Sequence, residues 1–103
     1  EAKQHLLAAA DVLVYMGNLE KLFTAVRRAL VTNGLFLFTA ESLLPEEAPP
    51  FVLRDTGRYA HAQSYIEQQL QANGLAIRIR EHDFLRLNKN TPLSGFYYIV
   101  QKY

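Results

Sequence analysis

The sequence AADVLVYMGNLEKLF at residues 9–23 and the sequence NGLFLFTAE at residues 33–41 decide the fold of this chain. Together they predict the end of a strand, a loop, an amphipathic helix, a tight turn and a buried strand. Asn33 and Gly34 tolerate the left-handed backbone conformation, so the helix is expected to end at this pair. Residues 35–39 carry no charge, which is typical of a central strand covered on both faces.

The expected helix has one apolar side and clear signals at both ends. Asn18 is a good capping residue, and Glu20 in the first turn suits the helix dipole. Arg27 and Arg28 suit the dipole near the other end. The apolar side consists of residues at helical spacing, namely Leu19, Leu22, Phe23, Val26 and Leu30.

Other elements are expected on both sides of this region. Residues 5–10 are apolar and fit a short buried parallel strand, with a helix as the open alternative. Residues 41–56 hold three of the four prolines, which predicts a loop or lid without regular structure. A second helix is expected from about residue 61 to residue 72, closed by Asn73-Gly74.

The last two strands are expected at residues 75–80 and 96–100, joined through a turn at residues 88–92. Their connection has no room for a helix, so the pair is expected to be antiparallel. The preceding alternation of strands and helices predicts a parallel sheet with right-handed crossovers. The predicted fold class is α/β, with four strands, two helices and a final antiparallel hairpin.

This order of elements resembles the second half of a class I S-adenosylmethionine-dependent methyltransferase domain, which has a Rossmann-like sheet. Residues 9–15 resemble the end of the family's fourth strand and the loop after it. Residues 30–39 resemble the turn into its fifth strand, although most relatives have two glycines where this chain has Asn33-Gly34. The sequence GRYAH at residues 57–61, followed by Tyr65, resembles a narrower group, the predicted methyltransferases attached to tetratricopeptide repeats.

The resemblance implies that residues 1–103 form the C-terminal half of a methyltransferase domain. The half with the family's glycine-rich cofactor loop is expected to be absent, since the chain has no G-x-G pattern. S-adenosylmethionine would then be the cofactor of a parent protein that methylates a small molecule or a protein. This part would supply the substrate-side wall and be inactive alone. A cytoplasmic location is expected.

Eight residues are candidates for the implied site. Asp11 follows a predicted strand, where a carboxylate points into the cleft of an open α/β sheet. The ring of Tyr15 has a π-face that attracts a sulfonium. His61 is a candidate base, because histidine is the usual general base at neutral pH. The candidates for catalysis are Asp11, Tyr15 and His61, those for cofactor contact are Ala9, Ala10 and Asp11, and those for substrate contact are Tyr15, Glu41, Arg58 and Tyr59.

Five of these residues also have a simpler structural interpretation. Asp11 and Glu41 fit ordinary solvated loop acids, and Tyr15 fits an aromatic residue that packs at the entrance of the helix. His61 fits the first residue of the second helix, and Arg58 fits a solvated charge. The sequence leaves both interpretations open.

Composition excludes several other classes of function. The net charge of +1 gives no long-range attraction to nucleic acids or anionic membranes, so neither is expected as a partner. No apolar run approaches the ~20 residues of a membrane span. The chain has no cysteine, and its three histidines share no metal-ligand spacing, so no metal site is expected.

A second function is open, that of a non-catalytic Rossmann-like interaction module. In the methyltransferase order, the strand His5–Ala10 lies against a first strand that this chain lacks. Its bare edge would favour strand exchange or a homodimer. A receiver-type or dinucleotide-binding half-domain is a further alternative for the fold, but neither ends in the strand-turn-strand expected from Leu75 to Val100.

Overall fold

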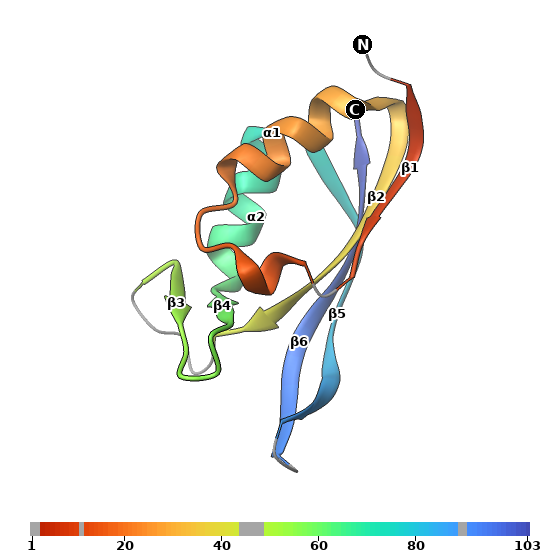
Figure 1. The fold of residues 1–103 in the computed structure, drawn as a ribbon. Coiled ribbons are helices and arrows are strands. Elements are labelled where there is room, and N and C mark those ends of the chain that lie inside the picture. The colour runs from red at the N-terminus through yellow and green to blue at the C-terminus, as the bar shows by residue number, and fades with distance from the viewer. Residues whose placement is uncertain (1–2, 11, 44–48, 89–90) are drawn as a thin grey trace.

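The computed structural model describes residues 3–10, 12–43, 49–88 and 91–103 (Figure 1). The elements in chain order are β1 (Gln4–Ala9), the short 3-10 helix η1 (Leu13–Tyr15), α1 (Glu20–Ala29), β2 (Leu30–Ser42), β3 (Phe51–Leu53), β4 (Tyr59–His61), α2 (Gln63–Ala72), β5 (Leu75–Asn88) and β6 (Thr91–Lys102). In the described part of the chain, neither α1 nor α2 is long and apolar enough to cross a membrane.

Strand β2 lies at the centre of the sheet. It pairs in parallel with β1 through residues 35–38, and with β4 through residues 41–42 farther along the same edge. On its other edge β2 pairs antiparallel with β6, and β6 pairs antiparallel with β5. The predicted α/β class, the parallel pairing of the first strands and the antiparallel final hairpin are therefore confirmed.

The prediction that residues 41–56 form an irregular loop is wrong for residues 41–42 and 51–53, which are strand residues. β2 continues through Ser42, and Phe51–Leu53 form β3, which pairs antiparallel with β4. Prolines exclude central strands but not a short outer strand, so Pro49 and Pro50 can precede β3 directly. Gly57, at φ 81°, takes the left-handed conformation in the turn between the two strands. Residues 44–48 lie outside the described residues.

Two predicted helix boundaries also differ from the structure. α1 ends at Ala29, because Leu30 already starts β2 and the β-branched Val31 and Thr32 favour extended backbone. Asn33 has the left-handed φ of 69° that its residue type suggested, but it lies inside β2. α2 starts at Gln63, so His61 belongs to β4. The end of α2 at Asn73-Gly74 is confirmed, with Gly74 at φ 66°.

Both helices pack on the same face of the sheet, where the core lies (Figure 1). Phe36 and Phe38 stack at 5.0 Å between ring centroids, and Tyr98 of β6 stacks on Phe38 at 4.9 Å. Phe23 of α1 packs on the same rings, 5.5 Å from Phe38. Leu70 and other apolar residues of α2 complete this core. The amphipathic side predicted for α1 therefore does bury its Phe23 against β2.

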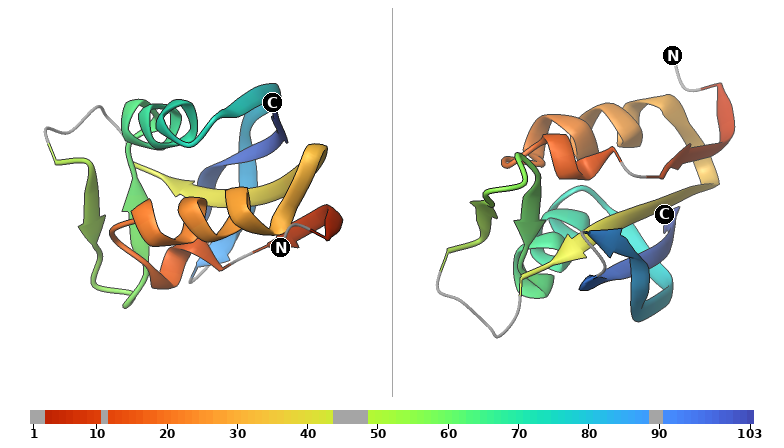
Figure 2. Two further views of the ribbon diagram at one scale, coloured as in Figure 1. Left: turned by 90° about the horizontal axis from the view of Figure 1, so that it is seen from above. Right: turned by 60° about the horizontal axis from the view of Figure 1, so that its bottom comes forward.

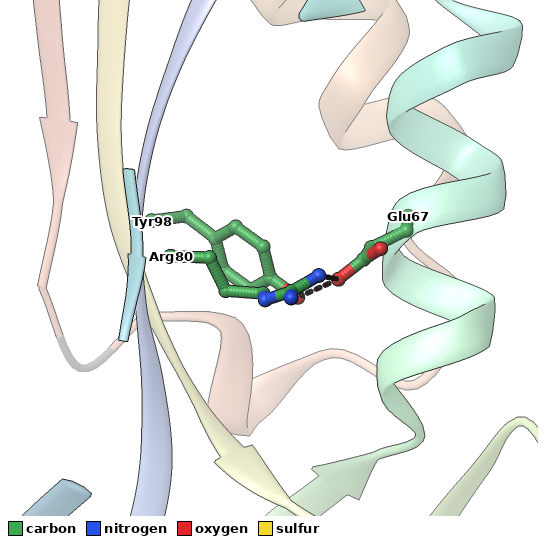
Figure 3. Close-up of polar contacts among 3 residues, drawn as sticks. All are labelled: Glu67, Arg80 and Tyr98. Carbon is green, nitrogen blue, oxygen red and sulfur yellow. Dashed lines mark hydrogen bonds and ion pairs between the residues drawn. The ribbon is translucent and has the colours of Figure 1, made fainter. Parts of the chain in front are cut away.

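A polar contact joins α2 to the final hairpin (Figure 3). Glu67 of α2 accepts a hydrogen bond from the Tyr98 hydroxyl at 3.0 Å and from Nη1 of Arg80 at 2.7 Å. Burial and the neighbouring Glu67 carboxylate raise the pKa of Tyr98. Arg80 thus forms an ion pair with Glu67 of α2 on the helix-bearing side of β5.

The other face of the sheet carries no helix among the described residues. In β2 the side chains of Phe36 and Phe38 are buried, whereas Leu37 and Thr39, which point the other way, are half-buried. The prediction that this strand is covered on both faces is therefore wrong. An open, mainly apolar groove of about 500 Å³ lies on this face, and its lining includes Ala8, Ala10, Leu37, Ile79, Tyr97 and Ile99.

Candidate functional site

The candidate site lies where β1 and β2 end, between the loop before α1 and the β3–β4 hairpin. Figure 2 shows β3 and β4 beside η1 and this loop. Carboxyl ends of parallel strands are the usual place for ligands in open α/β sheets. Of the predicted cofactor contacts, Ala9 ends β1 and is half-buried, and Ala10 is exposed and lines the groove. Asp11 lies outside the described residues.

Three predicted substrate contacts, from three separate segments, meet in one cluster. Nη1 of Arg58 donates to the hydroxyl of Tyr15 at 3.3 Å, and the guanidinium carbon lies 5.2 Å from the centre of the Tyr15 ring. Nε of Arg58 lies 3.5 Å from Oε2 of Glu41. We call these three residues the Arg58 cluster. Its members were predicted separately, and the structure brings them together.

The members of the Arg58 cluster differ strongly in exposure. The Glu41 side chain is 3% exposed and that of Arg58 17%, so this ion pair is largely shielded from water. Tyr15 is 64% exposed. The cluster therefore presents an aromatic surface to solvent, with a guanidinium stacked on the ring and a carboxylate behind it. Glu41 is a residue of β2 itself, and its interpretation as a solvated loop acid is wrong.

Tyr59 and His61 belong to a second group, built from aromatic rings of the hairpin and α2. We call Phe51, Tyr59, His61 and Tyr65 the aromatic cluster. The rings of Phe51 and Tyr59 meet edge to face at 6.0 Å, and those of His61 and Tyr65 lie nearly parallel at 6.3 Å. Such packing fixes the hairpin against the first turn of α2.

His61 is fully buried, and its Nε2 lies 3.1 Å from the carbonyl oxygen of Gly17. A carbonyl oxygen only accepts, so this contact assigns the proton to Nε2. Burial lowers the pKa of His61, although the carbonyls of Gly17 and Met16 oppose the shift. The neutral ring with a proton on Nε2 is therefore favoured. The interpretation of His61 as the start of α2 is wrong, and its donor group is engaged by the backbone.

The sequence analysis did not identify three residues of the site. These are Gly17, Phe51, and Tyr65 in its role as a hydrogen-bonding group. A Cβ at Gly17 would lie 2.5 Å from Cε1 of Phe51 and 2.8 Å from Cε1 of Tyr59. The usable signal was a glycine directly before a helix cap, since glycine permits close approach of the backbone to a neighbour. In the part of the chain that the structure describes, no three His, Asp or Glu residues gather as metal ligands.

The fold of this chain is similar to that of several S-adenosylmethionine-dependent methyltransferases of known structure. No family model and no curated protein sequence matches the chain. A methyltransferase from Methanosarcina mazei superposes with a TM-score of 0.77 at 14% identity, over 95% of this chain and 58% of that chain. One from Mesorhizobium loti gives 0.71 at 16% identity, over 99% and 64%.

A third similar structure was solved with a bound ligand. The magnesium protoporphyrin IX methyltransferase of Synechocystis, with bound S-adenosylmethionine, superposes with a TM-score of 0.62 at 14% identity, over 100% of this chain and 41% of that chain. The chain thus has a methyltransferase fold and spans less than two thirds of the length of each of these proteins.

Proposed function

We propose that this chain is the C-terminal part of a methyltransferase domain and that its parent transfers a methyl group from S-adenosylmethionine. The observation that carries the proposal is the convergence of Tyr15, Arg58 and Glu41 at the end of β2, in a fold shared with methyltransferases. Fold alone does not fix a reaction, so the site must support it. The Arg58 cluster lies at the strand ends where such ligands bind.

The residues present suit a cofactor along β1. Ala9 and Ala10 have small side chains that let a ligand approach the backbone, and Asp11 follows them as a carboxylate for a cationic group. S-adenosylmethionine supplies an electrophilic methyl group as a sulfonium, so the protein's task is chiefly to bind and orient the reactants. Tyr15, Arg58 and Glu41 would form the wall that holds the acceptor, with Tyr59 behind them.

The acceptor in this proposal is a small molecule or a protein side chain. The exposed ring of Tyr15 is the surface that it would contact first. The attachment to tetratricopeptide repeats and a cytoplasmic location belong to the same proposal and rest on the sequence resemblance alone.

The test is isothermal titration of S-adenosylmethionine into this chain and into a longer chain that adds the upstream residues of its gene. We expect binding by the longer chain alone, because the resemblance assigns most of the cofactor site to the upstream half. A matched variant of the longer chain, Asp11→Asn, keeps the shape of the side chain and should weaken binding. Absence of binding by the longer chain would overturn the proposal.

A second candidate function is self-association. Among the described residues no strand pairs with the outer edge of β1, and Leu6 on this strand is 58% exposed. An unpaired strand edge is a template for pairing with another chain. We therefore propose, as the alternative, a non-catalytic module that forms a homodimer through β1. Light scattering of the purified chain tests this, and a monomer at high protein concentration would refute it.

A further inference from the structure

We propose that His61 and Tyr65 are positioning residues, which hold the loop of residues 16–19 and thereby place Tyr15 against Arg58. The link to methyl transfer rests on the proposed function, whereas the contacts themselves do not. Neither residue needs to touch a substrate to act in this way, because each is joined to the backbone of the loop.

Two hydrogen bonds connect the loop to these side chains. The Nε2–H group of His61 donates to the carbonyl oxygen of Gly17 at 3.1 Å. The backbone N–H of Leu19 donates to the Tyr65 hydroxyl at 2.9 Å. One bond thus satisfies a carbonyl and the other an amide, on either side of Asn18.

The hydrogen bond from the Leu19 N–H to the Tyr65 hydroxyl satisfies a backbone group at the start of α1. The first N–H groups of a helix have no partner within the helix. The side chain of Asn18 accepts from the N–H of Glu20 at 2.9 Å, which leaves the N–H of Leu19 to be satisfied elsewhere. Leu19 is fully buried, so water does not replace a lost partner easily. The hydroxyl of Tyr65 therefore fixes the beginning of α1 from a distant part of the chain.

Close packing at Gly17 makes these bonds possible. Because a Cβ there would lie within 3 Å of ring carbons of Phe51 and Tyr59, the loop backbone lies directly on the aromatic cluster. The β3–β4 hairpin and the loop consequently form one packed unit. A shift of the loop would require the rings of Phe51 and Tyr59 to move as well.

This unit determines the geometry of the Arg58 cluster. Arg58 directly precedes β4, and Tyr15 lies two residues before Gly17. Both partners of the Tyr15–Arg58 contact are thus attached to segments that His61 and Tyr65 hold together. The exposed contact between Tyr15 and Arg58 is then a consequence of the buried contacts, and it should be lost when they are removed.

Nuclear magnetic resonance of the isotopically labelled chain tests the proposal without any cofactor. We expect at least a tenfold faster amide exchange of Leu19 in Tyr65→Phe, with weaker nuclear Overhauser contacts between Tyr15 and Arg58. The matched control is Tyr59→Phe, which also loses one hydroxyl but keeps the two loop hydrogen bonds. Equal exchange of Leu19 in both variants would overturn the role of Tyr65.

A second pair of variants tests His61. His61→Gln keeps a donor near the position of Nε2, whereas His61→Phe keeps the ring and loses the donor. We expect the Tyr15–Arg58 contacts to persist in the glutamine variant and to weaken in the phenylalanine variant. The imidazole nitrogen shifts should show the proton on Nε2. A proton on Nδ1, or contacts that survive equally in both variants, would overturn the role of His61. None of these readouts depends on whether the parent binds S-adenosylmethionine.

Discussion

Replacing Tyr98 by phenylalanine should change the stability of this chain in a way that reverses with pH. Tyr98 is 1% exposed, and its hydroxyl donates to Glu67 at 3.0 Å (Figure 3). A hydrogen bond to a charged acceptor contributes about 1.5 kcal/mol. At pH 7 Tyr98→Phe is therefore expected to lower the free energy of unfolding by roughly this amount.

At alkaline pH the tyrosine itself becomes unfavourable for the folded state. Burial raises the pKa of Tyr98 in the folded chain, whereas in the unfolded chain the group titrates near its model value of 10.0. Its contribution to stability is thus complete below pH 10 and is lost as the pH rises, since only the unfolded state releases the proton. At pH 11 this proton release by the unfolded state lowers the free energy of unfolding of the wild type by about 1.4 kcal/mol. That loss offsets the contribution of the hydrogen bond to Glu67. The two proteins should then be about equally stable.

Urea denaturation followed by circular dichroism at pH 7, 9, 10 and 11.5 measures this difference. We expect the wild type to be the more stable protein at pH 7 and the less stable one at pH 11.5. Ile66→Val is a suitable control, because it removes a buried methyl group near Glu67 and should lower stability by about 1 kcal/mol at every pH. A difference between wild type and Tyr98→Phe that stays constant from pH 7 to pH 11.5 would refute the reasoning.

Three further changes test other parts of the structure. Gly17→Ala should lower the free energy of unfolding by about 1–3 kcal/mol in urea denaturation, because the added Cβ overlaps the Phe51 ring. Burial lowers the pKa of His61 in the folded chain below the usual value of 6.5, which applies to the unfolded chain, so stability should fall as the pH drops below 6.5. This acid dependence of the free energy of unfolding should be smaller in His61→Gln. Leu6→Lys should reduce any self-association through β1 in sedimentation velocity experiments.

The sequence predicted the order of elements well because each long element has a clear period. The helical spacing of Leu19, Phe23 and Val26 predicted α1, and the pair Asn73-Gly74 predicted the end of α2. β3 and β4 were both missed, because each has only three residues and the two depend on pairing with each other and with β2 rather than on a local preference.

The burial of β2 shows a second limit of sequence patterns. An uncharged strand such as residues 35–39 is compatible with cover on one face or on two. Phe36 and Phe38 point to the helices, whereas Leu37 points to the open groove, and both sets are apolar. The apolar composition of the strand therefore indicates that burial of both faces is favourable, but it does not identify which part of a protein would bury the second face.

The candidate site was predictable in its place but not in its contacts. Tyr15 comes after β1, Glu41 lies near the end of β2, and both strands end at the same edge of the sheet. The order of elements therefore allowed their proximity to be predicted. Arg58 joins them through the hairpin, and Tyr15 and Arg58 are 43 residues apart in the chain. Without β3 no argument could fix the direction of the Arg58 side chain. His61 was assigned to a helix for the same reason.

The helix-free face of the sheet and the outer edge of β1 bear on both functions that we propose, methyl transfer by a parent protein and self-association. Parallel strands such as β1 and β2 are normally covered on both faces, and here Ile79 of β5 and Tyr97 of β6 remain partly exposed on the same open face. If the remaining part of a methyltransferase domain covers this face, the outer edge of β1 is paired by the same part. Cover by a second copy would instead use that edge for the homodimer. In these two proposals the outer edge of β1 pairs either with the rest of a methyltransferase domain or with a second copy, so a longer chain that binds S-adenosylmethionine should have lost the tendency to associate through β1.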